Sequence, residues 1–217
     1  MVLWGEQRAP TRGPKPSLTV DGIAAAGIAI AAAEGLGAVS MQRVAAYLGC
    51  TKMALYRYLP GKAELVALMV ERSLGVPPAL PRDDWRAALA EWTGLLMRGF
   101  LENPWTLPAT VGARPVGPSE IAWTEAALLA LDGLPLSGAE RLDTIAVLVG
   151  HARGLAEQAT AQLTESGLVA AMAEHADRFP ALAAALNDLR PGDADQAFDF
   201  GLERILDGLS VLIDRRR

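Results

Sequence analysis

A short segment near residue 50 carries cations, a hydroxyl and aromatic side chains at the spacing of one helix. Thr51 can cap a helix that begins at Lys52 and ends near Leu59. Leu55 and Leu59 are four residues apart and should face inward. This leaves five side chains to face outward: Lys52, Met53, Ala54, Tyr56 and Arg57. With Tyr58, the helix offers two tyrosines and two cations, a set that can contact phosphates and base edges. An ordinary helical hairpin with solvated charges would show the same periodicity.

A second short helix is expected immediately before this one. Ser40 can cap it, Val44 and Leu48 give it an apolar side, and Gly49 ends it. The turn that joins the two helices is Leu48-Gly49-Cys50-Thr51. Two short helices joined by a glycine-containing turn form a helix-turn-helix, whose second helix enters the major groove of DNA. The spacing is therefore compatible with a DNA-reading module and, equally, with an ordinary small helical hairpin.

Residues 19–65 closely resemble the N-terminal domain of the tetracycline-repressor (TetR) family of bacterial regulators. The resemblance rests on motifs that occur in order and without a gap: Glu34-Gly35, Ser40, Val44-Ala45-Ala46-Tyr47-Leu48-Gly49, Leu55-Tyr56-Arg57-Tyr58-Leu59 and Lys62-Ala63-Glu64-Leu65. It implies an all-α fold, with an N-terminal three-helix helix-turn-helix domain followed by a larger helical domain for ligand binding and dimerisation.

The resemblance also implies roles for single residues. Tyr56 and Lys62 match positions that grip phosphates, and the start of the second helix matches positions that contact the DNA backbone. The expected DNA-binding residues are Ser40, Met41, Gln42, Arg43, Thr51, Lys52, Met53, Ala54, Tyr56, Arg57, Tyr58 and Lys62. Among the base-facing positions, Met53 and Ala54 can contact a thymine methyl, whereas Lys52 can read the acceptors of guanine.

The distribution of charge along the chain agrees with this interpretation better than the total does. The formal net charge is −5, which by itself argues against a nucleic-acid partner. However, residues 1–76 hold 8 Lys and Arg against 5 Asp and Glu, and residues 77–217 hold 12 against 20. Three of the basic residues lie in the first 17 positions, which we expect to be a flexible arm that either enters a minor groove or is simply solvated.

The rest of the chain is also helical in pattern. Helices are expected over 19–34, 40–48, 51–59, 62–74, 83–102, 118–132, 138–165, 167–176, 179–189 and 194–214. The prolines after Val76 indicate a domain boundary. We therefore predict an arm over 1–17, a DNA-binding domain over 18–76 and an effector-binding and dimerisation domain over 77–217.

Dimerisation is expected because a single short recognition helix gives little affinity or specificity. The resemblance places the dimer face on the helices near 138–165 and 194–214. The residues that recur there at helical spacing are Leu148, Ala152, Leu155, Ala159, Phe198, Leu202, Ile205 and Leu209. The alternative is that these side chains pack only in the core of their own chain.

Four of the five tryptophans lie between residues 85 and 123, where members of the family bind a small effector. The expected effector-binding residues are Trp92, Met97, Phe100, Trp105, Trp123 and His151. Taken one at a time, each tryptophan is as well explained by an ordinary hydrophobic core.

Several other classes of protein are disfavoured. A lone Cys50 allows neither an intramolecular disulfide nor a cysteine-based zinc site, and we expect no metal, no cofactor and no catalytic residues. Gly35-Leu36-Gly37 lacks the third glycine of a dinucleotide fingerprint, and lipase, P-loop and zinc-protease motifs are missing. The apolar run over 22–33 is too short to span a bilayer. The prediction is a cytoplasmic homodimer that is not an enzyme, binds double-stranded palindromic operator DNA as a repressor, and is released by an unidentified small molecule. The sequence does not separate repression from activation. A helical interaction module without DNA binding is the alternative.

Overall fold

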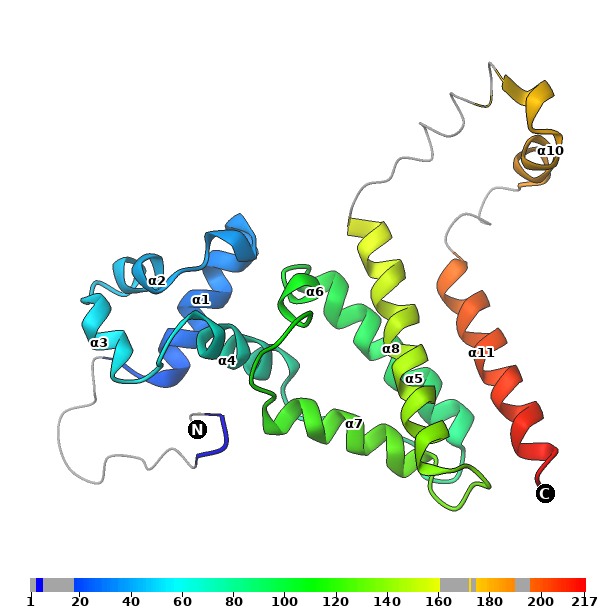
Figure 1. Ribbon diagram of the computed structural model, residues 1–217, viewed down its shortest axis with the longest axis horizontal. Helices are drawn as coiled ribbons and strands as arrows, with labels where there is room; N and C mark the ends of the chain where they lie inside the picture. The colour runs from blue at the N-terminus through cyan, green and yellow to red at the C-terminus, as the bar shows by residue number, and fades with distance from the viewer. Residues whose placement is uncertain (1–2, 6–17, 161–171, 173–174, 190–195) are drawn as a thin grey trace. The chain divides into compact units, whose positions relative to one another are not determined.

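The computed structural model describes residues 3–5, 18–160, 172, 175–189 and 196–217, and every regular element in these ranges is a helix (Figure 1). The chain divides into two compact units, Met1–Asp132 and Gly133–Arg217. Most of the predicted arm, most of the predicted helix over 167–176 and the end of the one predicted over 138–165 lie outside the described residues.

Each of the first three helices begins at a hydroxyl side chain. They are α1 (Val20–Glu34), α2 (Met41–Tyr47) and α3 (Lys52–Tyr56), with a 3₁₀ turn η1 (Leu36–Ala38) between the first two. Thr19, Ser40 and Thr51 each accept a hydrogen bond from the backbone N–H three residues further on, at 3.0, 3.1 and 3.2 Å. The three caps predicted from the sequence are thereby confirmed.

Helix α3 is shorter than predicted, because Arg57 already forms its C-cap. Leu59 precedes a proline, which disfavours the helical conformation at that residue. Leu59 is nevertheless completely buried, as is Leu55. The inward face expected for these two leucines is therefore correct although the helix does not reach the second.

Helix α4 (Lys62–Leu74) lies at the centre of the first unit, and residues 65–71 of it are all buried. It packs against α1, α6 (Thr106–Ala109) and α7 (Pro118–Ala130). Trp105 and Ala109 belong to the same hydrophobic cluster as the buried residues of α1 to α4. The core of the helix-turn-helix thus continues beyond residue 76, which is why the first compact unit extends to residue 132.

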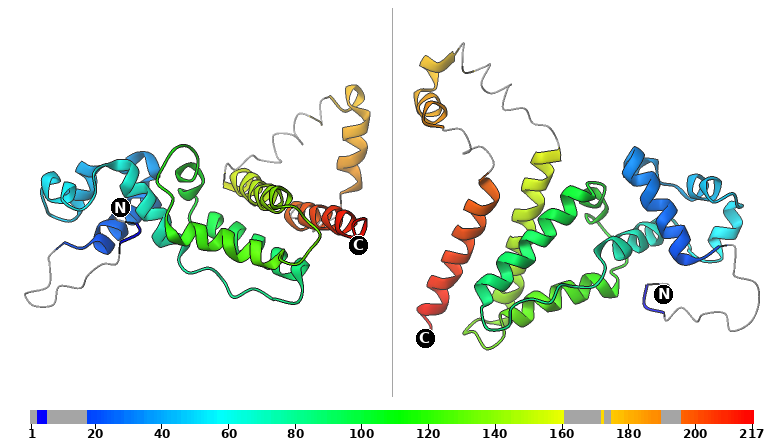
Figure 2. Two further views of the ribbon diagram at one scale, coloured as in Figure 1. Left: turned by 60° about the horizontal axis from the view of Figure 1, so that its bottom comes forward. Right: turned by 180° about the vertical axis from the view of Figure 1, so that it is seen from behind.

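The remaining long helix of the first unit is α5 (Trp85–Glu102), which packs against α7 (Figures 1 and 2). Asp84 caps α5 by accepting a hydrogen bond from the N–H of Ala87 at 3.0 Å. Between the two helices, the indole N–H of Trp92 donates to the carbonyl oxygen of Trp123 at 2.9 Å. This bond fixes the register of α5 against α7.

The second unit is built on α8 (Gly138–Thr160) and α11 (Ala197–Asp214), which pack side by side. It also contains a 3₁₀ turn η2 (Ala176–Arg178) followed by α10 (Pro180–Asp188). At the start of α8, Ser137 N–H donates to Glu140 Oε2 at 2.8 Å and Glu140 N–H donates to Ser137 Oγ at 3.3 Å. These reciprocal bonds form a capping box.

Candidate nucleic-acid interface

The turn between α2 and α3 depends on a glycine. Gly49 has a φ of +65°, in the left-handed region that other residues adopt only with strain. The Gly49 N–H donates to Ala46 O at 3.2 Å and the Cys50 N–H to Ala45 O at 3.0 Å, so the turn also satisfies the end of α2. With Val44 and Leu55 completely buried beneath it, the turn sets the direction of α3 relative to α2.

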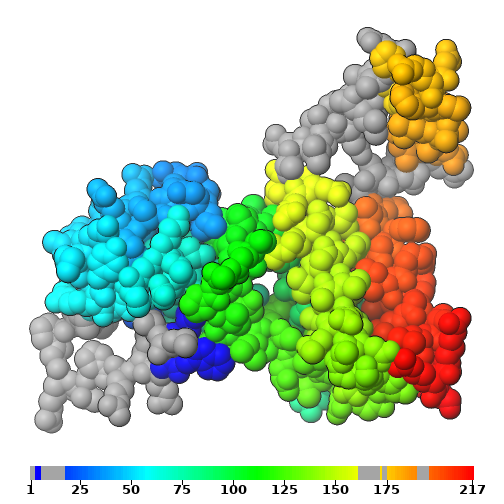
Figure 3. Space-filling model, viewed as in Figure 1, coloured from blue at the N-terminus to red at the C-terminus, as the bar shows by residue number. Residues whose placement is uncertain are grey.

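Helix α3 presents the predicted base-facing residues together on the surface. Thr51, Lys52 and Met53 are exposed, Met53 to 72%, and Ala54 is half-buried. The Lys52 ammonium lies 5.6 Å from the centre of the Tyr56 ring, a cation–π distance. The segment that carries α2 and α3 forms one continuous face in the space-filling view (Figure 3, light blue to cyan).

Two further cations border this face. Arg57 is exposed at the C-terminal end of α3, and Lys62 is exposed as the first residue of α4. The first amides of α4 have no acceptor within the helix, so they and Lys62 together form a place suited to an anion. Gln42 is exposed on the first turn of α2, where the same argument holds.

Besides Ser40 and Thr51, whose hydroxyls cap helices, three predicted DNA contacts are engaged within the protein. The Met41 side chain is buried, which leaves only its backbone amide for a phosphate. Tyr58 donates its hydroxyl to Leu18 O at 3.1 Å and so holds the chain before α1. Arg43 pairs with Glu34 at 2.6 Å, but both side chains are about half exposed, and a surface pair of this kind contributes only ~0.2–1 kcal/mol. Arg43 can therefore exchange this partner for DNA at little cost.

Sequence reasoning missed one exposed aromatic residue at this surface. Tyr47, the last residue of α2, is 62% exposed and stands next to the turn that leads to α3. Tyr47 lies in a motif that carries the family resemblance but gives this residue no role of its own, and only its exposure in the structure distinguishes it. Cys50, in the same turn, is half-buried and packs against the core.

The predicted effector-binding residues of the first unit are mostly interior. Trp92, Phe100, Trp105 and Trp123 are buried and Met97 is half-buried. The indole nitrogens of Trp105 and Trp123 are buried without a hydrogen-bond acceptor among the described residues. Buried donors normally have an acceptor, so these two indoles are suited to a bound molecule that supplies oxygen atoms.

His151 belongs to the second unit and is held by α11. Its ring stacks on Phe198, with centroids 5.4 Å apart and an angle of 16° between the planes. The Nε2 atom lies 2.8 Å from the carbonyl oxygen of Phe198, and the ring lies directly against Gly201. This imidazole joins α8 to α11, and its expected role toward an effector stays a prediction.

The predicted dimer residues divide by burial. Leu148, Ala152, Leu202 and Leu209 are buried within the second unit itself, Leu155, Phe198 and Ile205 are half-buried, and Ala159 is exposed. The apolar surface that α8 and α11 leave uncovered includes Val147, Phe200 and Val211, which are 51%, 63% and 49% exposed. Sequence periodicity did not select these three residues.

Within the described ranges, no three His, Cys, Asp or Glu side chains are grouped so that they could hold a metal ion. None of the described helices combines the length and hydropathy that a bilayer crossing needs.

The fold and the exposed face of α3 define a helix-turn-helix DNA-binding protein with a helical C-terminal region. A family model described as "Bacterial regulatory proteins, tetR family" matches residues 23–69, and one described as "Tetracyclin repressor-like, C-terminal domain" matches residues 77–213. The chain belongs to the TetR family of bacterial transcriptional regulators.

Two curated relatives are regulators from actinobacterial species. The chain is 37% identical over 233 residues to the HTH-type transcriptional repressor DrrR1 of Streptomyces coeruleorubidus, covering 100% of this chain and 86% of the relative. It is 28% identical to an HTH-type transcriptional regulator of Saccharopolyspora erythraea, covering 97% of this chain and 92% of the relative.

Solved structures of ActR from Streptomyces coelicolor have the same fold. The complex of ActR with actinorhodin is 27% identical, with a TM-score of 0.77, over 92% of this chain and 98% of ActR. The structure of apo ActR is 26% identical, with a TM-score of 0.75, over 90% of this chain and 96% of ActR.

Proposed function

We propose that this protein is a cytoplasmic, homodimeric repressor that binds a near-palindromic operator and releases it when a small molecule binds. The observation that carries the proposal is the capped helix α3, which presents Thr51, Lys52 and Met53 to solvent beside the Lys52–Tyr56 contact. The similarity to the repressor DrrR1 supports repression. No catalytic role is proposed.

The DNA contacts follow from the chemistry of the exposed side chains. Lys62 and Tyr56 bind phosphates, the first amides of α2 bind a third phosphate, and Arg57 adds charge at the edge. Lys52 reads a guanine and Met53 lies against a thymine methyl.

A dimer places two copies of α3 in successive major grooves, ~34 Å apart. We infer that α8 and α11 form the dimer face, with Val147, Phe200 and Val211 supplying apolar surface.

The effector is inferred to have an apolar, ring-containing body with oxygen acceptors. Buried tryptophans would surround the body, and the unpaired indole N–H groups of Trp105 and Trp123 would donate to the oxygens. Because ActR has been crystallised with actinorhodin and is 27% identical to this chain, actinorhodin is the first compound to test. An effector that lowers DNA affinity by ~5- to 150-fold supplies ~1–3 kcal/mol of coupling.

Selection of DNA from a random pool by the full-length protein tests the proposal. The expected result is an enriched palindrome whose half-sites are one helical turn apart, ~10 base pairs from centre to centre, and a salt-sensitive affinity. Repeating the binding with actinorhodin should release the DNA. Absence of any enriched sequence would favour a helical interaction module instead, and a monomer at micromolar concentration would contradict the dimer.

A further inference from the structure

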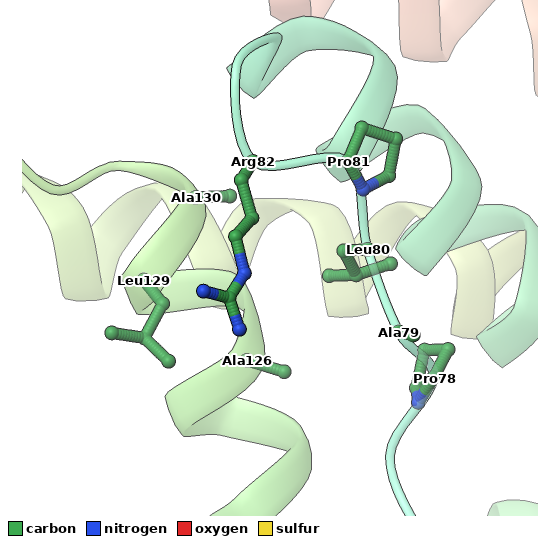
Figure 4. A pocket seen from close by; sticks show the side chains of 8 residues that line it. All are labelled: Pro78, Ala79, Leu80, Pro81, Arg82, Ala126, Leu129 and Ala130. Carbon is green, nitrogen blue, oxygen red and sulfur yellow. The ribbon is translucent and has the colours of Figure 1, made fainter.

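A cavity of about 480 Å³ lies in the first unit, between the segment that follows α4 and one side of α7. Its walls come from two stretches of chain (Figure 4): Pro78, Ala79, Leu80, Pro81 and Arg82 on one side, and Ala126, Leu129 and Ala130 on the other. The volume is in the range of sites that hold a drug-sized molecule. None of the residues predicted to bind the effector lines it.

The walls are apolar except at one point. Proline, alanine and leucine side chains supply seven of the eight lining residues, and Arg82 supplies the only charge among them. The Arg82 side chain extends from its loop toward Ala126 and Leu129 of α7 (Figure 4). Among the described residues, none forms an ion pair with Arg82. Arg82 is exposed, so water solvates its donors, and no carboxylate among the described residues competes with a ligand for them.

The loop that carries these residues is held in place at both ends. Gly75 ends α4 with a φ of +63°, a conformation that turns the chain sharply away from the helix. At the other end, Asp84 is committed to capping α5 through the N–H of Ala87. The prolines inside the loop further restrict its backbone. The wall of the cavity is therefore shaped before any ligand arrives.

From the uniform apolar lining and the single unpaired guanidinium, we propose that this cavity binds an amphipathic anion: a small molecule with an apolar ring or chain and one carboxylate or sulfonate. The apolar body lies against Leu80, Leu129 and the prolines, and the anionic group pairs with Arg82. A guanidinium suits this task because it binds a carboxylate through two parallel hydrogen bonds and is weakly hydrated. The site is separate from the predicted effector residues, and the proposal does not depend on DNA binding.

A matched pair of fluorescent probes tests the proposal on the full-length protein. 8-Anilinonaphthalene-1-sulfonate carries the anionic group, and N-phenyl-1-naphthylamine is the same apolar body without it. Titration should show, for each probe, a saturable site that the substitutions described next weaken. Added salt should weaken binding of the sulfonate and leave the neutral amine unchanged, because only the ion pair is screened.

Substitutions then locate the site. Arg82→Gln should weaken the sulfonate by about 5-fold, the size expected of an exposed ion pair, and leave the neutral probe unchanged. Arg82→Lys should keep most of the affinity. The matched control is Arg98→Gln, which removes an exposed arginine of α5 that does not line the cavity and should change neither probe.

Two further substitutions test the cavity itself. Ala126→Trp should fill it and weaken both probes by about tenfold or more. Leu129 is 64% exposed, so Leu129→Glu should leave the fold intact and weaken the sulfonate more than the neutral probe. This second variant tests the cavity if Ala126→Trp does not fold.

Unchanged sulfonate binding in Arg82→Gln and Leu129→Glu would overturn the proposal, and so would equal weakening of both probes by Arg82→Gln. A change of oligomeric state in Leu129→Glu would also overturn it, since it would show that a second copy covers this face.

Discussion

The Glu71 carboxylate on α4 accepts the backbone N–H of Ser119 in the first turn of α7, with Oε1 at 2.8 Å and Oε2 at 3.1 Å. Glu71 is only 6% exposed, although the six residues before it on α4 are all apolar. A carboxylate at a helix N-terminus is favoured both by the free amides and by the helix dipole. Since α4 begins at Lys62, this contact connects the far end of a predicted DNA-contacting helix to α7.

Removal of this carboxylate is expected to destabilise the protein. Glu71→Ala leaves the Ser119 amide without its acceptor in a partly buried place, which should lower the free energy of unfolding by ~1–3 kcal/mol. Glu71→Gln should cost less, because an amide oxygen can still accept one bond. Urea unfolding followed by circular dichroism measures both. An unchanged midpoint in Glu71→Ala would show that solvent replaces the contact without cost.

Gly117 supplies a control on the same contact. A Cβ atom at this position would collide with the Glu71 carboxylate, so Gly117→Ala should be destabilising in the natural background. When Glu71 is replaced by alanine, the obstacle is absent and the cost of Gly117→Ala should largely disappear. A double-mutant cycle on the two positions measures this difference. Strict additivity would mean that the two residues do not act on one another.

Two lysines at the candidate interface should affect DNA binding in different ways. Lys62→Ala should weaken binding to all sequences and reduce the slope of log affinity against log salt by about 1, because it removes one phosphate contact. Lys52→Ala should instead relax the preference at one base pair by ~1–3 kcal/mol, because it removes a base contact. Fluorescence anisotropy on the selected operator and its single-base variants, at several salt concentrations, separates the two effects.

Arg98→Gln is the matched control for both lysine variants, since it removes an exposed cation from α5 and should change neither the slope nor the preference. A Lys62→Ala variant that binds as tightly as the natural protein at every salt concentration would show that the start of α4 does not meet a phosphate. Altered base preference in that variant would contradict its assignment as a phosphate contact.

The elements of this fold could be read from the sequence where the interactions that define them are local. Thr19, Ser40 and Thr51 each bond an amide three residues away, and Gly49 is needed by the turn in which it stands. A hydroxyl before an apolar periodic segment, or a glycine after one, is visible without knowledge of the tertiary structure. The same holds for the capping box that begins at Ser137.

The features that escaped prediction depend on residues distant in sequence. Glu71 occurs 48 residues before its partner, and nothing in the surrounding run indicates that this acid is buried. The cavity beside Arg82 is formed only when the loop meets α7. In the second unit, periodicity selected Leu148 of α8 for the dimer face, but Leu148 packs inward and the neighbouring Val147 is half exposed. Adjacent positions on a helix differ by only ~100°, so a broad apolar stripe contains both kinds of residue.

Gly201 is required by the His151 ring that lies against it. A Cβ at position 201 would collide with Cε1 of the imidazole, so Gly201→Ala should force α8 and α11 to shift or the ring to leave its bond with Phe198 O. The expected loss is ~1–3 kcal/mol, the range for overpacking in a well-packed core. Thermal unfolding monitored by circular dichroism measures it.

The double variant tests whether the ring is the obstacle. With alanine at 151, Gly201→Ala should cost nothing and should even stabilise slightly, because alanine is favoured over glycine within a helix by ~0.5–1 kcal/mol. A penalty that persists in the absence of the imidazole would place the obstacle elsewhere in the packing of α8 against α11.

Glu140 gives the second unit a defined response to acid. Both its oxygens accept hydrogen bonds from the Arg216 guanidinium at 2.6 Å, and Oε2 also accepts the N–H of Ser137. These bonds lower the pKa of the Glu140 carboxyl from its ordinary value of 4.5 to about 2, and the hydrogen bonds from Arg216 are the largest cause. Because the pKa is lower in the folded state, the contribution of Glu140 to stability is complete above about pH 4.5 and disappears as the pH falls toward 2.

Glu140→Gln isolates this contribution from that of the other carboxylates. The melting temperature of the variant should lie below that of the natural protein by a constant amount between about pH 6 and pH 7, and the difference should shrink between pH 4.5 and pH 2. Arg216→Gln removes the largest cause of the shift, so in that background the effect of Glu140→Gln should already vanish at a higher pH, closer to 4.5. A difference between the natural protein and Glu140→Gln that stayed constant down to pH 2 would contradict the prediction. A contribution that comes from the charge of Glu140 must decrease as the carboxyl is protonated.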